Sequence, residues 1–140
     1  MKVEELTGAE LDYWVALADG REGVAESDLD EDERAWGEPV LYWYGSNGEL
    51  GGTEPLSNYG SPSTDWSSGG PIIERERITV QASQAGDWRA FLGDGTTNAG
   101  TGRSRSEPII ATRGDTPLVA AMRAYVASKF GEEVSQEEAQ

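Results

Sequence analysis

The sequence predicts an α+β domain, with helices near both ends packed on a small, mostly antiparallel sheet of four to five short strands. Helix-capping residues occur at residues 7–20 and again at 116–131, and short β-branched, aromatic or alternating runs lie between them. At 140 residues the chain suits one modest hydrophobic core. We therefore expect a single domain over residues 1–131, followed by an acidic, disordered tail over residues 132–140.

The first helix is expected at about residues 8–19. Thr7 and Glu10 have the spacing of a capping box, in which each side chain bonds the other residue's backbone N–H. Leu6 and Leu11 have the spacing of a hydrophobic staple across the same helix start. Both patterns predict that a helix begins directly after Thr7.

Acidic residues are concentrated on the flanks of the chain. Residues 1–49 hold 14 acidic and three basic residues, a charge of −11, and the last ten residues add −4, while residues 50–130 are neutral. Residues 20–37 contain the acidic run at residues 28–33, and their apolar residues follow no period. They are therefore expected to form an exposed acidic linker, or at most a loose turn.

Several short segments are typical of strands. Residues 39–45 are β-branched and aromatic, and an Asn-Gly pair in residues 45–52 suits a hairpin turn with at most a short returning strand. The further expected strands are the alternating residues 71–83, residues 87–93 and residues 108–111. Residues 94–106, which are rich in Gly, Ser and Thr, are expected to be a flexible loop.

The closing helix has the clearest signals. Thr116 is an N-cap residue, Pro117 suits the first helical position, and Gly131 suits the position after the last turn. An apolar stripe at helical spacing lies between them, formed by Leu118, Met122, Tyr125, Val126 and Phe130.

The composition excludes several functions. The chain has no cysteine and no histidine, which rules out disulfides, thiolate nucleophiles and Cys/His zinc sites. The acidic run at residues 28–33 lacks the glycine and glutamate offsets of a calcium loop, so no metal or other cofactor is expected. No catalytic motif is present, and the chain is expected not to be an enzyme.

The N-terminus has no apolar signal-peptide region, and no stretch reaches the roughly 20 apolar residues that cross a membrane. We therefore expect a cytoplasmic protein with no membrane partner. A formal charge of −15 also argues against direct binding to nucleic acid.

The segment "YGSPSTDWSSGGPIIE", residues 59–74, is a candidate ligand site. Its hydroxyls and bare glycine amides can approach a small polar ligand, an aspartate can bind a ribose diol, and a tryptophan can stack on a base. The alternative is an ordinary surface loop, in which the aspartate caps a turn and the tryptophan covers a sheet edge. The candidate ligand residues here are Tyr59, Ser63, Thr64, Asp65, Trp66, Gly69 and Gly70.

Three further residues extend this candidate site: Arg75, Arg113 and Thr116. Arg75 and Arg77 share one side of the expected strand over residues 71–83, where they line a groove or form cross-strand ion pairs. Thr116 lies at a helix N-terminus, which favours anions, and Arg113 can add a bidentate phosphate contact there. Simple capping by Thr116, with Arg113 in solvent, is the alternative.

Three stretches resemble the phage NinX-like family of small, uncharacterised bacteriophage and prophage proteins. They are "MKVEELTGAELDYWVALADG", "YGSPSTDWSSGGPIIERERI" and "TPLVAAMRAYVASKFGEEV", roughly half of the chain. The resemblance implies a phage accessory protein expressed in the cytoplasm of a bacterial host. It also adds weight to residues 59–71, because that segment resembles the most recognisable part of the family.

Two functional hypotheses remain open. The first is a non-catalytic binder of a small nucleotide-like ligand, such as a counter-defence sponge that sequesters a nucleotide-derived host immune signal, with a homo-oligomer closing the site. The second is an acidic, DNA-mimic-like inhibitor of a host nucleic-acid or defence enzyme, which acts through the acidic flanks. The second predicts that residues 20–37 are essential and that Asp65 and Trp66 are dispensable. An enzyme that uses Asp65 or Glu74 with a metal ion has no support beyond available carboxylates.

Overall fold

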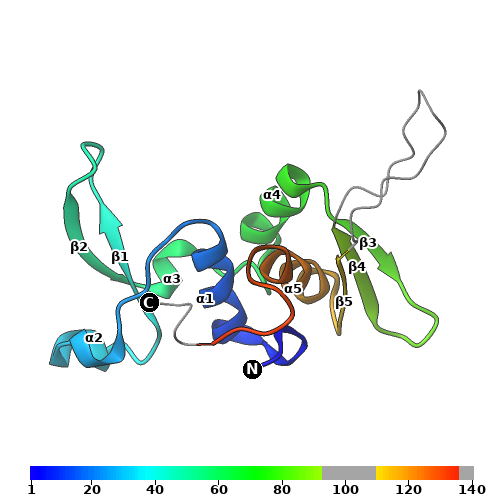
Figure 1. The fold of residues 1–140 in the computed structure, drawn as a ribbon, viewed down its shortest axis with the longest axis horizontal. Helices are drawn as coiled ribbons and strands as arrows, with labels where there is room; N and C mark the ends of the chain where they lie inside the picture. The colour runs from blue at the N-terminus through cyan, green and yellow to red at the C-terminus, as the bar shows by residue number, and fades with distance from the viewer. Residues whose placement is uncertain (93–109, 136–140) are drawn as a thin grey trace.

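The computed structural model describes residues 1–92 and 110–135 (Figure 1). Its helices are η1 (Val3–Glu5), α1 (Gly8–Ala18), η2 (Glu26–Asp28), α2 (Glu31–Ala35), α3 (Leu56–Tyr59), α4 (Trp66–Glu76) and α5 (Pro117–Phe130). Its strands are β1 (Val40–Tyr44), β2 (Leu50–Pro55), β3 (Thr79–Ala82), β4 (Trp88–Leu92) and β5 (Ile110–Gly114). The predicted α+β class is confirmed.

The strands form two antiparallel sheets, and the prediction of one sheet with four to five strands is wrong. β1 pairs with β2 in a two-stranded hairpin, while β3, β4 and β5 form a three-stranded sheet in that order. The two sheets lie at opposite ends of the molecule, with α1, α4 and α5 between them (Figure 1). The helices α3 and α4 lie between the hairpin and β3 along the chain.

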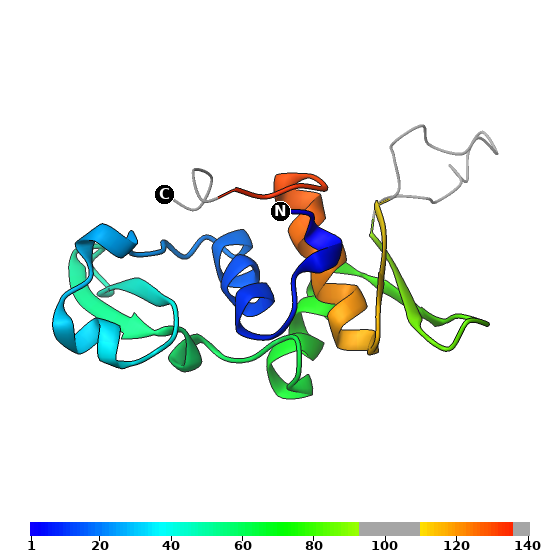
Figure 2. The ribbon, with the colours of Figure 1, turned by 90° about the horizontal axis from the view of Figure 1, so that it is seen from below.

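The main core is built around α5, whose predicted bounds and caps are confirmed. The Thr116 hydroxyl accepts a hydrogen bond from the Val119 amide at 3.1 Å, Pro117 opens the helix, and Gly131 follows it with a positive φ of 87°. One side of α5 packs on β4 and β5, and another side packs on α1 (Figure 2). Since α5 contacts both, it links α1 to the sheet.

The first helix also forms where expected, but its capping box does not. Leu6 and Leu11 are fully buried at the start of α1, as the staple predicts. The Thr7 side chain makes no capping hydrogen bond. The apolar contacts therefore fix this helix start, and the Glu10 carboxylate is not engaged there.

The strand predicted over residues 71–83 is wrong in its first half. The Asp65 carboxylate caps α4 by accepting a hydrogen bond from the Ser67 amide at 2.9 Å, and the helix continues through Pro71. It ends at Arg77, which has a left-handed φ of 54°, and β3 begins two residues later. The alternation of apolar and charged residues that predicted one strand therefore runs across the end of a helix and the start of a strand.

The acidic segment over residues 20–37 is folded rather than a linker. A capping box between Asp30 and Glu33 starts α2, with both hydrogen bonds at 2.8 Å. The Val24 amide donates to the Val40 carbonyl at 2.9 Å, which ties the segment to the hairpin. We call residues 20–55, which hold this segment and the hairpin, the acidic lobe.

The C-terminal residues after α5 return to the N-terminus. The Val3 amide donates to the Glu132 carbonyl, and the Val134 amide donates to the Met1 carbonyl, both at 2.8 Å. Val134 is buried, so residues 132–134 are part of the fold instead of a tail. The flexible loop expected over residues 94–106 and the tail residues 136–140 lie outside the described part of the chain.

Candidate functional site

Residues 59–71 do not form the open loop that the candidate site assumed. They comprise the end of α3, a turn and the first half of α4. Ser63 is buried in this turn, where its amide donates to the Asp12 carboxylate at 2.8 Å. Burial raises the pKa of Asp12, and the hydrogen bonds from Ser63 oppose that shift. Ser63 thus anchors the turn to α1 and does not face solvent.

Gly69 is also buried, where α4 meets the start of α5. A Cβ at this position would lie 2.4 Å from the Pro62 carbonyl oxygen and 2.6 Å from a methyl carbon of Leu118. Glycine is needed here because the two helices approach so closely. The same contact brings the N-terminal turn of α5, capped by Thr116, beside α4.

Thr64, Asp65 and Trp66 remain exposed at the N-terminus of α4. The Asp65 carboxylate accepts hydrogen bonds from the Ser67 amide at 2.9 Å and from its hydroxyl at 2.8 Å. The hydrogen bonds from Ser67 lower the pKa of Asp65. Trp66 exposes 56% of its surface, and half-buried Gly70 lies behind its ring. The alternative interpretation is thus correct that Asp65 is a cap, although of a helix instead of a turn, but Trp66 lies on that helix and not in a loop that covers a sheet edge.

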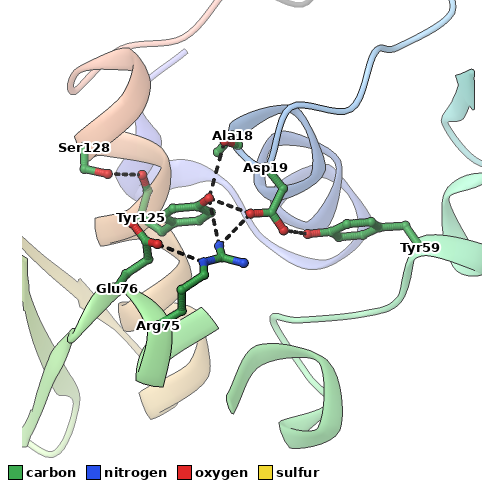
Figure 3. A network of polar contacts seen from close by, with 7 residues as sticks. All are labelled: Ala18, Asp19, Tyr59, Arg75, Glu76, Tyr125 and Ser128. Carbon is green, nitrogen blue, oxygen red and sulfur yellow. Dashed lines mark hydrogen bonds and ion pairs between the residues drawn. The ribbon is translucent and has the colours of Figure 1, made fainter. Parts of the chain in front are cut away.

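Tyr59 and Arg75, both predicted as site residues, are brought together by Asp19 at the C-terminus of α1 (Figure 3). The Asp19 carboxylate accepts hydrogen bonds from the Tyr59 hydroxyl at 2.5 Å, the Tyr125 hydroxyl at 2.6 Å and the Arg75 guanidinium at 2.6 Å. Arg75 also donates to Glu76 at 2.8 Å. The cross-strand pairing expected for Arg75 is wrong because Arg75 lies on a helix, from which it pairs with Asp19 and Glu76.

This Asp19 network is charged at neutral pH. Burial raises the pKa of Asp19, but hydrogen bonds from Tyr125, Tyr59 and Arg75 outweigh that effect and leave the pKa below its usual value. Burial and the bonds to Asp19 raise the pKa of both tyrosines, so their hydroxyls stay protonated donors. The network joins α1, α3, α4 and α5, and its first role is to hold these helices together.

The Asp19 network also fixes the base of the acidic lobe. The chain leaves α1 at Asp19 and returns through α3 to Tyr59, so their hydrogen bond closes the lobe at its base. Arg21 forms an ion pair with Glu54 and donates to the Tyr42 carbonyl at 3.2 Å. A basic residue within an acidic segment was the sequence signal for this contact, and sequence reasoning missed it.

Arg113 and Thr116 lie apart from the Asp19 network. Arg113 is exposed on β5, with its guanidinium 3.6 Å from the Asp87 carboxylate, and Thr116 caps α5. Two cavities among the described residues, of about 670 and 300 Å³, are lined by none of the ten predicted site residues. The structure therefore divides the predicted site among several places.

The acidic lobe exposes large hydrophobic residues that sequence reasoning did not identify. It holds ten acidic residues against Arg21 and Arg34. Of the six large hydrophobic residues that are exposed in the described chain, four lie in this lobe: Trp36 (40% exposed), Trp43 (42%), Tyr44 (47%) and Leu50 (57%). The strand pattern of residues 40–44 predicted β1, but not that its second half is exposed on a two-stranded hairpin.

Trp43 is held in place on this surface by glycines in the neighbouring strand. Its ring lies over β2, so that a Cβ at Gly51 would come within 2.0 Å of a ring atom, and Gly52 also contacts it. Glycine in a strand often marks such a close approach. Tyr44 is anchored too, because its hydroxyl donates to Glu22 at 2.7 Å. These exposed aromatic side chains are therefore positioned by specific contacts.

The fold and these surfaces define a small acidic α+β protein, and in residues 1–92 and 110–135 no three or more Asp or Glu residues gather to hold a metal. Over the same residues no helix has the length and apolar character needed to cross a membrane. The chain belongs to the family described as "Bacteriophage P22, NinX", which matches residues 2–129. No curated protein matches it. Family membership makes it a phage accessory protein.

Proposed function

We propose that this phage accessory protein is non-catalytic and acts by binding the basic surface of another protein through the acidic lobe. The observation that carries this proposal is the group of exposed aromatic residues, led by Trp36, Trp43 and Tyr44, on an ordered and strongly acidic part of the chain. The partner class is a host enzyme that binds nucleic acid, since such enzymes present basic surfaces.

Charge and residue type favour this partner. Residues 20–55 carry ten acidic and two basic residues, a charge of −8, which attracts a basic surface and speeds association with it. Tryptophan and tyrosine are the residue types that most often dominate binding energy in protein interfaces. The lobe combines both features within one stretch of 36 residues.

The ordering of the acidic segment strengthens this hypothesis. Acids in a loose linker cannot match the charges of a partner at fixed positions. Here the capping box of Asp30 and Glu33, and the backbone bonds of Val24 to Val40 and Tyr42 to Glu22, hold the acids on a folded scaffold. A pre-organised surface loses less entropy on binding.

Affinity capture from the bacterial host tests the proposal. The lobe variant replaces four exposed acids by their amides: Glu26→Gln, Asp28→Asn, Glu31→Gln and Asp32→Asn. Asp30 and Glu33 stay intact because they cap α2. The control variant makes the same charge change outside the lobe: Glu5→Gln, Glu74→Gln, Asp115→Asn and Glu133→Gln, all of them exposed.

We expect the native protein and the control variant to retain one common basic partner, and the lobe variant to retain it about tenfold less. Raising the salt from 0.1 to 0.5 M should also weaken capture, because exposed charges are screened. Equal recovery of every captured protein by the lobe variant would contradict the proposal.

The second candidate function is the nucleotide sponge, and one contact favours it. The approach of Gly69 to Leu118 brings α4 and the N-terminal turn of α5 side by side, with Trp66 exposed nearby. A helix N-terminus favours anions, and a tryptophan can stack on a base. Because this surface is open, a second subunit would have to close the site.

Isothermal titration separates the two functions. The panel holds cyclic dinucleotides, cyclic ADP-ribose isomers and ADP-ribose, tested against the native protein, Asp65→Ala and Trp66→Ala. If the acidic lobe is the functional surface, we expect background heats for every compound. Submicromolar binding of one compound that both substitutions abolish would instead favour the sponge.

A further inference from the structure

A cavity of about 670 Å³ lies between α1, the acidic lobe and the C-terminal residues. Tyr13 and Trp14 line it from α1, Val24 and Leu29 line it from the lobe, and Val134 closes it from the C-terminal side. This volume falls in the range of about 300–1,000 Å³ that is usual for small-molecule sites. The lining is mainly apolar and aromatic, which is also usual for such sites.

The walls of this cavity are fixed by specific contacts. The Tyr13 hydroxyl occupies the place of a side chain at Gly23, where a Cβ would lie 1.8 Å from it. The Val24 amide is bonded to Val40, and Met1 and Val134 exchange two backbone hydrogen bonds of 2.8 and 3.0 Å. The cavity is thus a built feature of the fold, lined by segments that are far apart in the sequence.

Two carboxylates give the cavity its charge. Glu10 and Glu26 both line it, and among the described residues neither side chain forms a hydrogen bond or an ion pair. The only positive group in the described lining is the amino group of Met1, which already donates to the Val134 carbonyl at 3.0 Å. A phosphate-bearing ligand would be repelled here, whereas an organic cation would be attracted.

We infer that this cavity binds a small organic cation with an aromatic or apolar body, its amine near Glu10 and Glu26 and its body against Tyr13 and Trp14. The apolar walls remove the body from water, and the tyrosine ring adds cation–π attraction. This site shares Glu26 with the acidic lobe but contains none of its exposed aromatic residues, and it does not depend on the function proposed for the lobe.

The test uses tryptamine as the probe and indole-3-propionate as a partner of similar size and opposite charge. Binding is followed on the full chain by shifts of the backbone amide signals in two-dimensional NMR spectra. We expect tryptamine to shift signals of α1 and of residues 24–29 with a submillimolar Kd. Indole-3-propionate should bind at least tenfold more weakly.

Substitutions in and outside the cavity show where tryptamine binds. Glu10→Gln and Glu26→Gln should each raise the Kd for tryptamine about threefold, the usual effect of one partly exposed charge, while Glu31→Gln outside the cavity should not change it. Ala9→Trp, which places a large side chain from exposed Ala9 into the cavity, should abolish binding, and Ala35→Trp serves as its control. Retained spectra would show that both variants fold.

Three outcomes of the tryptamine titrations would overturn the inference. They are equal binding of indole-3-propionate, shifts confined to residues outside the cavity, and no shifts at millimolar tryptamine. A host protein or peptide that shifts the same signals and excludes tryptamine would assign the cavity to a macromolecular partner and would also overturn it.

Discussion

Gly69→Ala is expected to destabilise the protein by about 3 kcal/mol, because overpacking in a closely fitted core costs this much. The added methyl would lie 2.4 Å from the Pro62 carbonyl oxygen and 2.6 Å from Leu118. The first of these atoms belongs to the backbone and cannot rotate away. Either α4 must move from α5, or the turn before α4 must rearrange. Urea unfolding followed by circular dichroism measures the change.

The neighbouring glycine provides a matched control. A Cβ at Gly70 would meet only the Trp66 ring, at 3.9 Å, which is ordinary van der Waals contact. Alanine favours a helix over glycine by about 1 kcal/mol, so Gly70→Ala should leave stability unchanged or increase it by up to that amount. If both variants unfold at the same urea concentration, the close packing of α4 on α5 is not present in solution.

Asp19→Ala is the second substitution with a large expected effect. It should lower the free energy of unfolding by about 3 kcal/mol. It removes the acceptor shared by Tyr59, Arg75 and Tyr125. Arg75 keeps its bond to Glu76, but the Tyr59 hydroxyl loses its partner in a half-buried site. Asp28→Ala is the control, since Asp28 is exposed and its carboxylate forms no hydrogen bond in the described structure. That substitution should change the free energy of unfolding by less than about 0.5 kcal/mol.

The pH dependence of Asp19→Asn tests the same network by another route. The pKa of Asp19 is lower in the folded protein than in the unfolded chain, where it lies near 3.9. The stability that the charged carboxylate provides is therefore fully present above about pH 5 and is lost as the pH falls through the folded pKa. We expect the native protein's advantage over Asp19→Asn to be constant from pH 5 to 7 and to narrow below pH 4. A constant difference down to pH 3 would contradict the assignment.

Local signals in the sequence were sufficient to predict both terminal helices and the hairpin. Thr116, Pro117 and Gly131 act over one turn each, and the apolar stripe between them has a single helical period. The hairpin of β1 and β2 likewise needs only two short strands around an Asn-Gly turn. These elements are confirmed because no distant contact overrides their local preference.

The helix α4 could not be predicted from periodicity alone. Ile72 and Ile78 share the parity of a strand, yet Ile72 packs on the core from a helix, while Ile78 follows the helix end. The Gly-Gly-Pro sequence also argues for a turn. The helix is stabilised instead by tertiary contacts. Gly69 fits against α5, and Arg75 forms a hydrogen bond with Asp19, which is 56 residues away in the sequence.

The places that the structure gives to the candidate site residues could not be predicted for the same reason. Tyr59 and Arg75 were predicted to bind a ligand, and in the structure both donate hydrogen bonds to the Asp19 carboxylate. Asp19 lies in a different part of the sequence, so no local pattern indicated this contact. The exposure of the aromatic residues in the acidic lobe could not be predicted from the sequence either. Trp43 and Tyr44 look like ordinary strand residues until the sheet proves to have only two strands.

The most direct measurement of the proposed binding surface is site-specific photo-crosslinking in the bacterial host. A photoreactive phenylalanine analogue replaces Trp36, Trp43 or Trp66, three tryptophans that are each at least 40% exposed. If the acidic lobe binds a host protein, the first two positions should form the same adduct and the third should form none. An adduct at Trp66 alone would contradict the proposal and would move the binding surface to the start of α4.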